Sequence, residues 1–214
     1  MKITTHNIIP KPMSEFEVPN SDIWYKETCF ESGNYYQIVA PSGTGKSSFV
    51  NIILGIRKDY NGEILFDNQN VAKFSLQDWT RIRTNVLSMV FQGLHLFPEL
   101  TVMENIQLKN ELTHHKNSAE IEEMVNRVGL SLHLHRKAEF LSYGQQQRIA
   151  VIRALCQPFQ FLLLDEPFSH LDSQNIGILE NLIVEEAQRQ QAGIIITSLH
   201  PYSNSLFAQN VVRL

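Results

Sequence analysis

The stretch APSGTGKSS, Ala40–Ser48, does most to restrict the possible folds of this chain of 214 residues. It follows YYQIVA, Tyr35–Ala40, a short apolar run that predicts a buried strand. It leads into KSSFVNIIL, Lys46–Leu54, which predicts a helix that ends at Gly55. A buried strand that passes through a glycine-rich turn directly into a helix is typical of α/β proteins. We therefore expect an α/β fold with this loop at one end of a sheet strand.

The same loop has the composition of a phosphate-binding turn. Gly43 and Gly45 allow the backbone to curl, so that successive N–H groups point inward at an anion. Lys46 could reach the β- and γ-phosphates of a nucleotide, the Ser47 hydroxyl could bind Mg²⁺, and the following helix adds its positive N-terminus. Ala40 stands where the general pattern GxxxxGK[ST] has its first glycine, but the phosphate nest uses later residues. We expect the whole loop to bind nucleotide: Ala40, Pro41, Ser42, Gly43, Thr44, Gly45, Lys46, Ser47 and Ser48.

Two acids follow the apolar run FLLL, Phe161–Leu164. A fully apolar strand is typical of a parallel sheet that is covered on both faces. Ligands of open α/β sheets bind at the carboxyl ends of the strands, which is where Asp165 and Glu166 stand. We expect Asp165 to orient Mg²⁺ or its water, and Glu166 to polarise a water for attack on the γ-phosphate.

The remaining pattern is a sheet core interrupted by helices. NGEILFDNQ, from Asn61, predicts a turn and then a short strand, and IIIT, 194–197, predicts a further strand. Between these strands, helices are predicted to begin near Thr101, Ser118 and Ser142, the first with the Thr-x-x-Glu spacing of a capping box.

This order of elements predicts one domain over residues 1–214. We assign 1–85 and 157–214 to a core sheet with helices on both faces, and 86–156 to a helical subdomain.

Composition excludes several classes of protein. The formal charge of −4 gives no basic footprint, so we expect no nucleic-acid partner. Cys29 and Cys156 lie far apart without CxxC spacing and are expected to be free thiols. No apolar run approaches the roughly 18 residues of a membrane span, and the first residues lack the apolar stretch of a signal peptide.

Six motifs occur in the order found in ABC-type ATPases: APSGTGKSS, Gln92 in VFQ, LSYGQQQR, FLLLDEP, SHLD and a late histidine. The chain therefore resembles the ATP-binding subunit of an ABC transporter over essentially its whole length. The resemblance implies a P-loop NTPase core of the ABC type, a helical signature subdomain and a small N-terminal antiparallel β region.

The resemblance also implies two ATPase domains packed head to tail, with each nucleotide between the P-loop of one and the signature sequence of the other. Ser142, Gly144 and Gln145 would then meet the nucleotide held by a second subunit. By itself Ser142 would be only a helix N-cap. Tyr143 replaces the first glycine of the usual LSGGQ, and its side chain could point away from the second subunit or stack.

Four further residues take roles from the resemblance. Gln92 would approach Mg²⁺ and the attacking water, Asp172 would lie at the dimer seam, and His200 would contact the γ-phosphate. Phe16 is the candidate that stacks on adenine, with Tyr25 as the alternative.

The function that follows is the ATP-hydrolysing subunit of a multi-subunit ABC transporter, using ATP and Mg²⁺. It would pair with a second copy or another ATPase subunit and drive a separate integral membrane permease subunit. We expect it in the cytoplasm, peripheral on the inner face of the cell membrane, and it is weakly similar to the lipoprotein-releasing and macrolide-export group.

Phe97 in LHLFPEL could contact the membrane subunit or pack within the helical subdomain. The alternatives are a soluble ABC-type ATPase and a non-hydrolysing, ATP-dependent clamp.

Overall fold

The computed structural model describes residues 1–15, 18, 20–202, 207 and 209–214, and contains two sheets. The N-terminal sheet is antiparallel, in the order β2-β1-β4-β5, with the bounds β1 Lys2–Pro10, β2 Glu27–Glu31, β4 Tyr60–Phe66 and β5 Gln69–Asn70. The second sheet is parallel, in the order β6-β7-β8-β3-β9, with the bounds β3 Tyr35–Val39, β6 Leu87–Val90, β7 Phe161–Asp165, β8 Gly193–Ser198 and β9 Asn210–Arg213.

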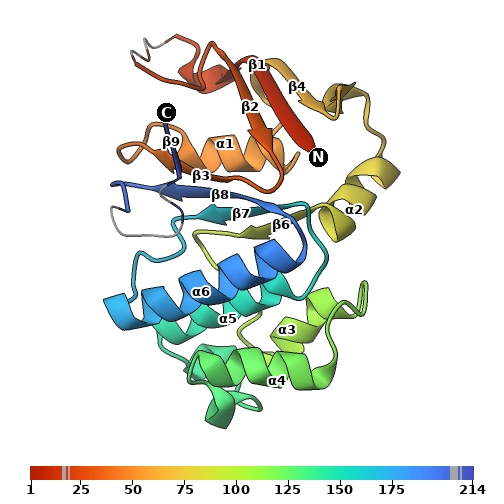
Figure 1. Cartoon of the computed structure of the whole chain (residues 1–214), viewed down its shortest axis with the longest axis vertical. Coiled ribbons are helices and arrows are strands. Elements are labelled where there is room, and N and C mark those ends of the chain that lie inside the picture. Colours follow the sequence, from red (N-terminus) through yellow and green to blue (C-terminus); the bar gives the residue numbers. More distant parts are fainter. Residues whose placement is uncertain (16–17, 19, 203–206, 208) are drawn as a thin grey trace.

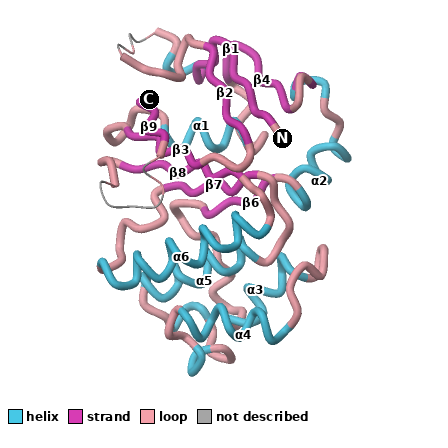
Figure 2. The backbone as a smooth tube through the Cα atoms, viewed as in Figure 1, coloured by secondary structure: helices cyan, strands magenta, loops and turns pink. Residues whose placement is uncertain are grey.

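Helices cover both faces of the parallel sheet, as predicted. Figure 1 shows α1 between the two sheets, with α5 and α6 on the opposite face and α3 and α4 beyond them. Figure 2 shows the same layers by secondary structure. The helices are α1 Lys46–Ile53, α2 Leu76–Asn85, α3 Val102–Asn110, α4 Ser118–Arg127, α5 Tyr143–Leu155 and α6 Ser173–Arg189. Short 3-10 turns lie at Lys11–Met13, Val71–Lys73, Ser131–His133 and Ala138–Phe140.

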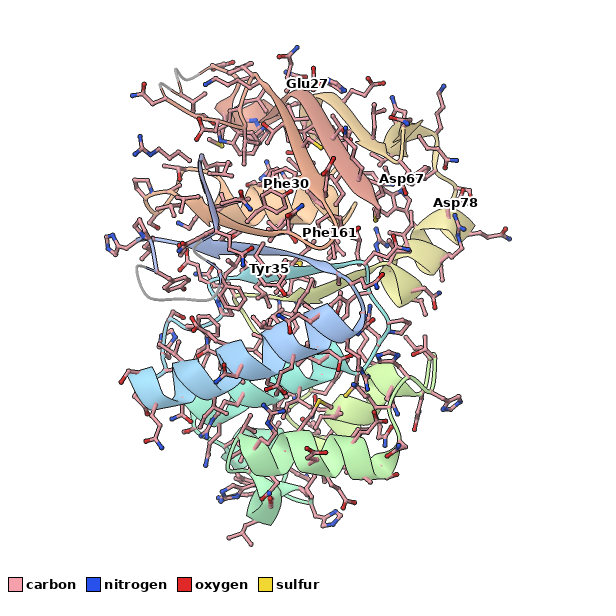
Figure 3. All side chains as sticks on the ribbon, viewed as in Figure 1. Glu27, Phe30, Tyr35, Asp67, Asp78 and Phe161 are labelled. Carbon is pink, nitrogen blue, oxygen red and sulfur yellow. The ribbon has the colours of Figure 1, made fainter. Side chains whose placement is uncertain are left out.

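The strand β7 explains why the layers form on both faces. Successive side chains of a strand point to opposite faces. Phe161 and Leu163 accordingly join the core cluster that contains α1 and the N-terminal sheet, whereas Leu162 and Leu164 join the cluster of α5 and α6. Figure 3 marks Phe30 and Phe161, two members of the first cluster. All five residues of β7 are buried, among them the four of the predicted apolar run Phe161–Leu164.

The predicted turn at Asn61 is wrong, because Asn61 and Gly62 lie inside β4. Gly62 has a φ of +91°, and a Cβ there would lie 2.5 Å from the backbone oxygen of Asn7. The register of β1 against β4 shifts at the same place, so this glycine serves a β-bulge. The turn comes later, at Asp67 and Asn68, which both have positive φ.

The three predicted helix starts are correct to within a residue. Thr101 and Ser142 are N-caps with complete capping boxes, and α4 begins at Ser118, as predicted, after the N-cap Asn117. Each box satisfies backbone N–H groups that the first turn of a helix leaves without intrahelical partners.

Both cysteines are free, as expected, and burial raises the pKa of the Cys156 thiol to about 12. Among the helices in the described part of the chain, none combines the length and apolar character that crossing a membrane would require.

Candidate nucleotide site

Four parallel strands bring the predicted site residues to one edge of the sheet. β3 runs into the loop 40–48, β6 is followed by Gln92, β7 ends at Asp165, and β8 is followed by His200. Carboxyl ends of parallel strands meet at the same edge, which is where open α/β sheets bind ligands.

The glycine-rich loop curls around the Lys46 side chain. Gly43 and Gly45 have φ of +81° and +101°, a region that glycine adopts without steric cost. A Cβ on Gly45 would also lie 3.0 Å from both Met13 Sδ and Trp24 Cζ2, so the close neighbours as well as the backbone conformation favour glycine there. The Lys46 ammonium donates to the backbone oxygens of Ala40 at 2.9 Å and Pro41 at 3.0 Å.

The three residues predicted to bind metal line one cavity of about 730 Å³. The Ser47 hydroxyl donates to Gln92 Oε1 at 3.5 Å, and Asp165 Oδ1 accepts from the Thr197 hydroxyl at 2.7 Å. A hydroxyl, an amide oxygen and a carboxylate form the oxygen donor set that Mg²⁺ prefers. The residues therefore fit this ion.

Glu166 lies between the loop and the segment that carries His200. Its Oε1 is 3.1 Å from the Lys46 ammonium, and its backbone N–H donates to the Thr197 hydroxyl at 3.1 Å. Its φ is +48°, a sparsely populated conformation for a residue with a side chain, of the kind found at functional sites. It lines a cavity of about 350 Å³ with Lys46 and Gln92, and another of about 200 Å³ with His200.

His200 is exposed, and the buried side chain of Gln37 holds its backbone. Gln37 Nε2 donates to Ser198 Oγ at 2.9 Å and to the backbone oxygen of His200 at 3.3 Å. Its Oε1 accepts from the backbone N–H of Tyr202 at 3.3 Å. Burial raises the pKa of the Tyr202 phenol, in the same segment, to about 12.

Ser142, Gly144, Gln145 and Asp172 lie at the N-termini of α5 and α6. Ser142 Oγ accepts from the backbone N–H of Gln145 at 3.3 Å, and Gln145 Oε1 accepts from the backbone N–H of Ser142 at 2.9 Å. Asp172 caps α6 by accepting from the backbone N–H of Asn175 at 2.8 Å, a bond that holds the pKa of Asp172 below its usual value.

Of the two candidates for stacking on adenine, the structure describes only one. Phe16 lies outside the described residues. Tyr25 is 47% exposed, and its hydroxyl donates to the backbone oxygen of Ser14 at 3.2 Å. Pro12 and Met13, which were not predicted, line the cavity beside Gly43.

Sequence reasoning missed three further residues of the site. Thr197 joins Asp165 to Glu166 through its hydroxyl, and only its place at the end of an apolar strand hints at this. Gln37 could have been noticed as a polar residue inside the apolar run YYQIVA. Arg57 donates to Ser48 Oγ at 2.7 Å and lines the loop cavity; we find no sequence signal for it.

The chain is similar to proteins of one family. The family profile described as ABC transporter matches residues 27–169. The lipoprotein-releasing system ATP-binding protein LolD of Saccharophagus degradans is 35% identical over 173 residues, which cover 78% of this chain and 75% of that protein. The glutamate/aspartate import ATP-binding protein GltL of Escherichia coli K12 is 34% identical over 171 residues, covering 78% of this chain and 70% of that protein.

Among solved structures, the dimer of MJ0796, a bacterial ABC transporter cassette, matches with a TM-score of 0.83 at 26% identity. The match covers 99% of this chain and 94% of that one. A post-hydrolysis MJ0796 dimer bound to ADP and Pi matches with a TM-score of 0.80. The predicted ABC-type fold is thus confirmed, and the chain belongs to the ABC transporter family of ATP-binding proteins.

Proposed function

We propose that the protein binds ATP with Mg²⁺ and hydrolyses it as one ATPase of a pair, coupled to a separate membrane protein. The observation that carries the proposal is the convergence of Ser47, Gln92 and Asp165 on one cavity, with Glu166 beside Lys46. This supports the proposal of a phosphate-binding loop, an oxygen donor set for Mg²⁺ and a candidate general base at one sheet edge.

The Lys46 ammonium and the Glu166 carboxylate form an ion pair in the site. Lys46 is 5% exposed and makes its bonds to loop oxygens and to Glu166. The phosphates of ATP carry more negative charge than Glu166 and compete for the same ammonium. Binding of the nucleotide would therefore draw Lys46 away and release the Glu166 carboxylate for catalysis.

Hydrolysis needs a water held in line with the γ-phosphate. Glu166 accepts a proton from that water as its oxygen bonds to the γ-phosphorus, while the bond from the γ-phosphorus to the bridging oxygen breaks and leaves ADP. Bound Mg²⁺ would neutralise charge on the phosphate oxygens. Gln92 positions the water, and His200 contacts the γ-phosphate from the segment held by Gln37.

The pairing of two ATPases is supported by the dimeric MJ0796 structures. In such a pair the start of α5, with Ser142, Gly144 and Gln145, would meet the nucleotide of the other subunit, and Asp172 would lie at the seam. A helix start suits this role because it carries N–H donors and a favourable dipole.

A membrane partner is supported by the names of the relatives and by one exposed segment. LolD belongs to a lipoprotein-releasing system and GltL to glutamate/aspartate import. Phe97 is 55% exposed, which leaves much of its ring open to a partner. The buried Asn105 holds this loop by donating to the backbone oxygens of Phe97, Leu100 and Thr101. We place the protein on the inner face of the cell membrane, with Phe97 toward the permease.

The first test is Glu166→Gln in purified protein. Loss of the general base lowers turnover by roughly 10²- to 10⁴-fold, while ATP binding stays within about twofold because the loop is unchanged. Glu122→Gln, an exposed change of the same kind on α4, is the control. Unchanged hydrolysis in Glu166→Gln would show that another group is the base.

The second test identifies the partner. Tagged Glu166→Gln protein is expressed in its own host, trapped with Mg-ATP and recovered from detergent-solubilised membranes. A polytopic membrane protein in near-equal amount, identified by mass spectrometry, supports a transporter subunit. Recovery with ribosomes or nucleic acid alone supports the soluble-ATPase alternative.

A further inference from the structure

Tyr143 occupies the first position of α5, directly after the N-cap Ser142. Its hydroxyl donates to the backbone oxygen of Gln92 at 2.9 Å, although the two residues are 51 positions apart. Its ring also packs edge-on against His170, with the ring centroids 4.5 Å apart and the planes at 65°. The side chain is 42% exposed, so it is not a core residue. It therefore joins the start of α5 to two segments of the nucleotide site.

The segment that follows Gln92 is held in an unusual conformation. Leu94 and His95 have φ of +59° and +49°, a region that residues with side chains rarely adopt. Arg153, near the other end of α5, donates to the backbone oxygens of Leu94 at 2.6 Å and His95 at 2.7 Å. One helix thus binds three carbonyls of this segment, and Tyr143 supplies the bond at Gln92 itself.

We propose that Tyr143 is a positioning residue that fixes Gln92 from the start of α5, and so links the two nucleotide sites of a pair within one chain. This rests on the proposed function, in which the start of α5 meets the second subunit's nucleotide while the Gln92 side chain meets the chain's own nucleotide. A shift of the α5 start is transmitted to the Gln92 backbone through a single hydrogen bond. The glycine usual at this position of the signature sequence has no side chain to make it.

The hydroxyl and the ring make separate contributions that substitutions can divide. Tyr143→Phe keeps the ring against His170 and removes only the hydroxyl. Tyr143→Gly removes both and restores the residue usual in the family. Tyr36→Phe is a matched control, because the Tyr36 hydroxyl also bonds to the backbone, accepting from Glu31 N–H at 2.9 Å.

The first experiment measures amide hydrogen exchange in residues 92–96 without nucleotide, so it does not depend on hydrolysis. Tyr143→Phe should speed exchange there by about two- to tenfold, the range expected for loss of one hydrogen bond. Tyr36→Phe should leave this segment unchanged. Equal exchange in Tyr143→Phe and the unmodified protein would overturn the proposal, because the bond would not restrain the segment.

The second experiment measures hydrolysis as Mg²⁺ and ATP are varied. Tyr143→Phe should raise the Mg²⁺ concentration for half-maximal rate and lower kcat by roughly fivefold, with the KM for ATP within about twofold. In a Gln92→Ala background the same change should have no further effect, because residues acting as one unit are not additive. Additive effects would overturn the proposal in favour of a local structural role. If the unmodified protein does not hydrolyse ATP, the proposed function fails, and the exchange experiment still decides the role of Tyr143.

Discussion

The starts of α1 and α5 are both suited to phosphate, yet they are built differently. α1 begins after Gly45, whose φ of +101° lies in the left-handed region and which has no side chain to cap the helix. α5 begins after Ser142, whose hydroxyl accepts from Gln145 N–H in a complete capping box. The first turn of α1 thus has no side-chain cap, whereas at α5 the backbone N–H of Gln145 is already bonded within the chain.

The difference indicates an order of events. An anion can bind at α1 without displacing any side-chain cap, so we expect ATP to bind there in a single chain. At α5 we expect the phosphate of a second subunit to compete with the cap. We therefore expect this start to act only when two chains close on ATP.

The two helix starts also differ in what they rest on. Figure 1 shows α1 enclosed between the two sheets, whereas α5 packs against α3 and α4 as well as against the core. That helical region is tied to α6 by side chains: Lys116 Nζ is 2.5 Å from Glu186 Oε2, and Arg127 is 2.6 Å from Glu185. The comparison predicts that removing either ion pair leaves ATP binding at α1 unchanged.

The largest effect is expected from Lys116→Met. The Lys116 and Glu186 side chains are only 4% and 8% exposed, and breaking a buried ion pair by removing one partner costs about 3 kcal/mol or more. Urea unfolding measures the loss, and ATP affinity should stay within about twofold. Lys73→Met, a change of the same kind at an exposed residue, should change neither the stability to urea nor the ATP affinity. If ATP affinity fell together with stability in Lys116→Met, ATP binding at α1 would depend on the helical region, and the comparison would be wrong.

Lys46→Ala should have the next largest effect, at the other helix start. Loss of the charged donor costs about 2 to 3 kcal/mol of binding, which raises the Kd for ATP roughly 30- to 150-fold. Equilibrium dialysis with labelled ATP measures this, and Lys73→Ala controls for net charge. If Lys46→Ala bound ATP as the unmodified chain does, the loop would not be the primary site.

Much of this comparison could be predicted, because it depends on local patterns. The strand, glycine turn and helix at 35–54 follow from neighbouring residues, as do the capping boxes at Thr101 and Ser142. The bulge of β1 opposite Gly62 was missed because glycine after asparagine is also a turn signal, and only the pairing of β1 with β4 decides between them.

The contacts that distinguish this chain could not be predicted. Lys116 and Glu186 are 70 positions apart, and Tyr143 and Gln92 are 51 apart. Residue type gives no indication of such a partner, because many polar residues could fill each place. The position of Gln92 after a strand was predictable, but the bond to its backbone oxygen depends on how α5 packs.

Ser142→Ala sharpens the comparison at α5. Loss of the N-cap costs about 1 kcal/mol of stability. In the Glu166→Gln background we expect the Kd of the ATP-bound dimer to rise roughly tenfold, because a hydrogen bond to a charged group is lost, with monomer ATP affinity unchanged. Analytical ultracentrifugation measures the dimer. Asn117→Ala, which removes the equivalent cap of α4, should cost similar stability without weakening dimerisation.

The smallest effect is expected on the free energy of unfolding when the pH is lowered. Burial is the largest single influence and raises the pKa of Glu186, but the hydrogen bond and charge of Lys116, together with two further side-chain hydrogen bonds, outweigh it, so the pKa lies below the usual value. A depressed carboxyl pKa contributes stability above the unfolded value of about 4.3, and this stability is lost as pH falls through the folded pKa. At pH 7 the unmodified chain should therefore be more stable to urea than Glu186→Gln. The gap should narrow as the pH falls below about 4, whereas Glu122→Gln should show no such gap. A gap that stayed constant from pH 7 down to the acid transition would mean that ionised Glu186 does not hold the helical region to α6.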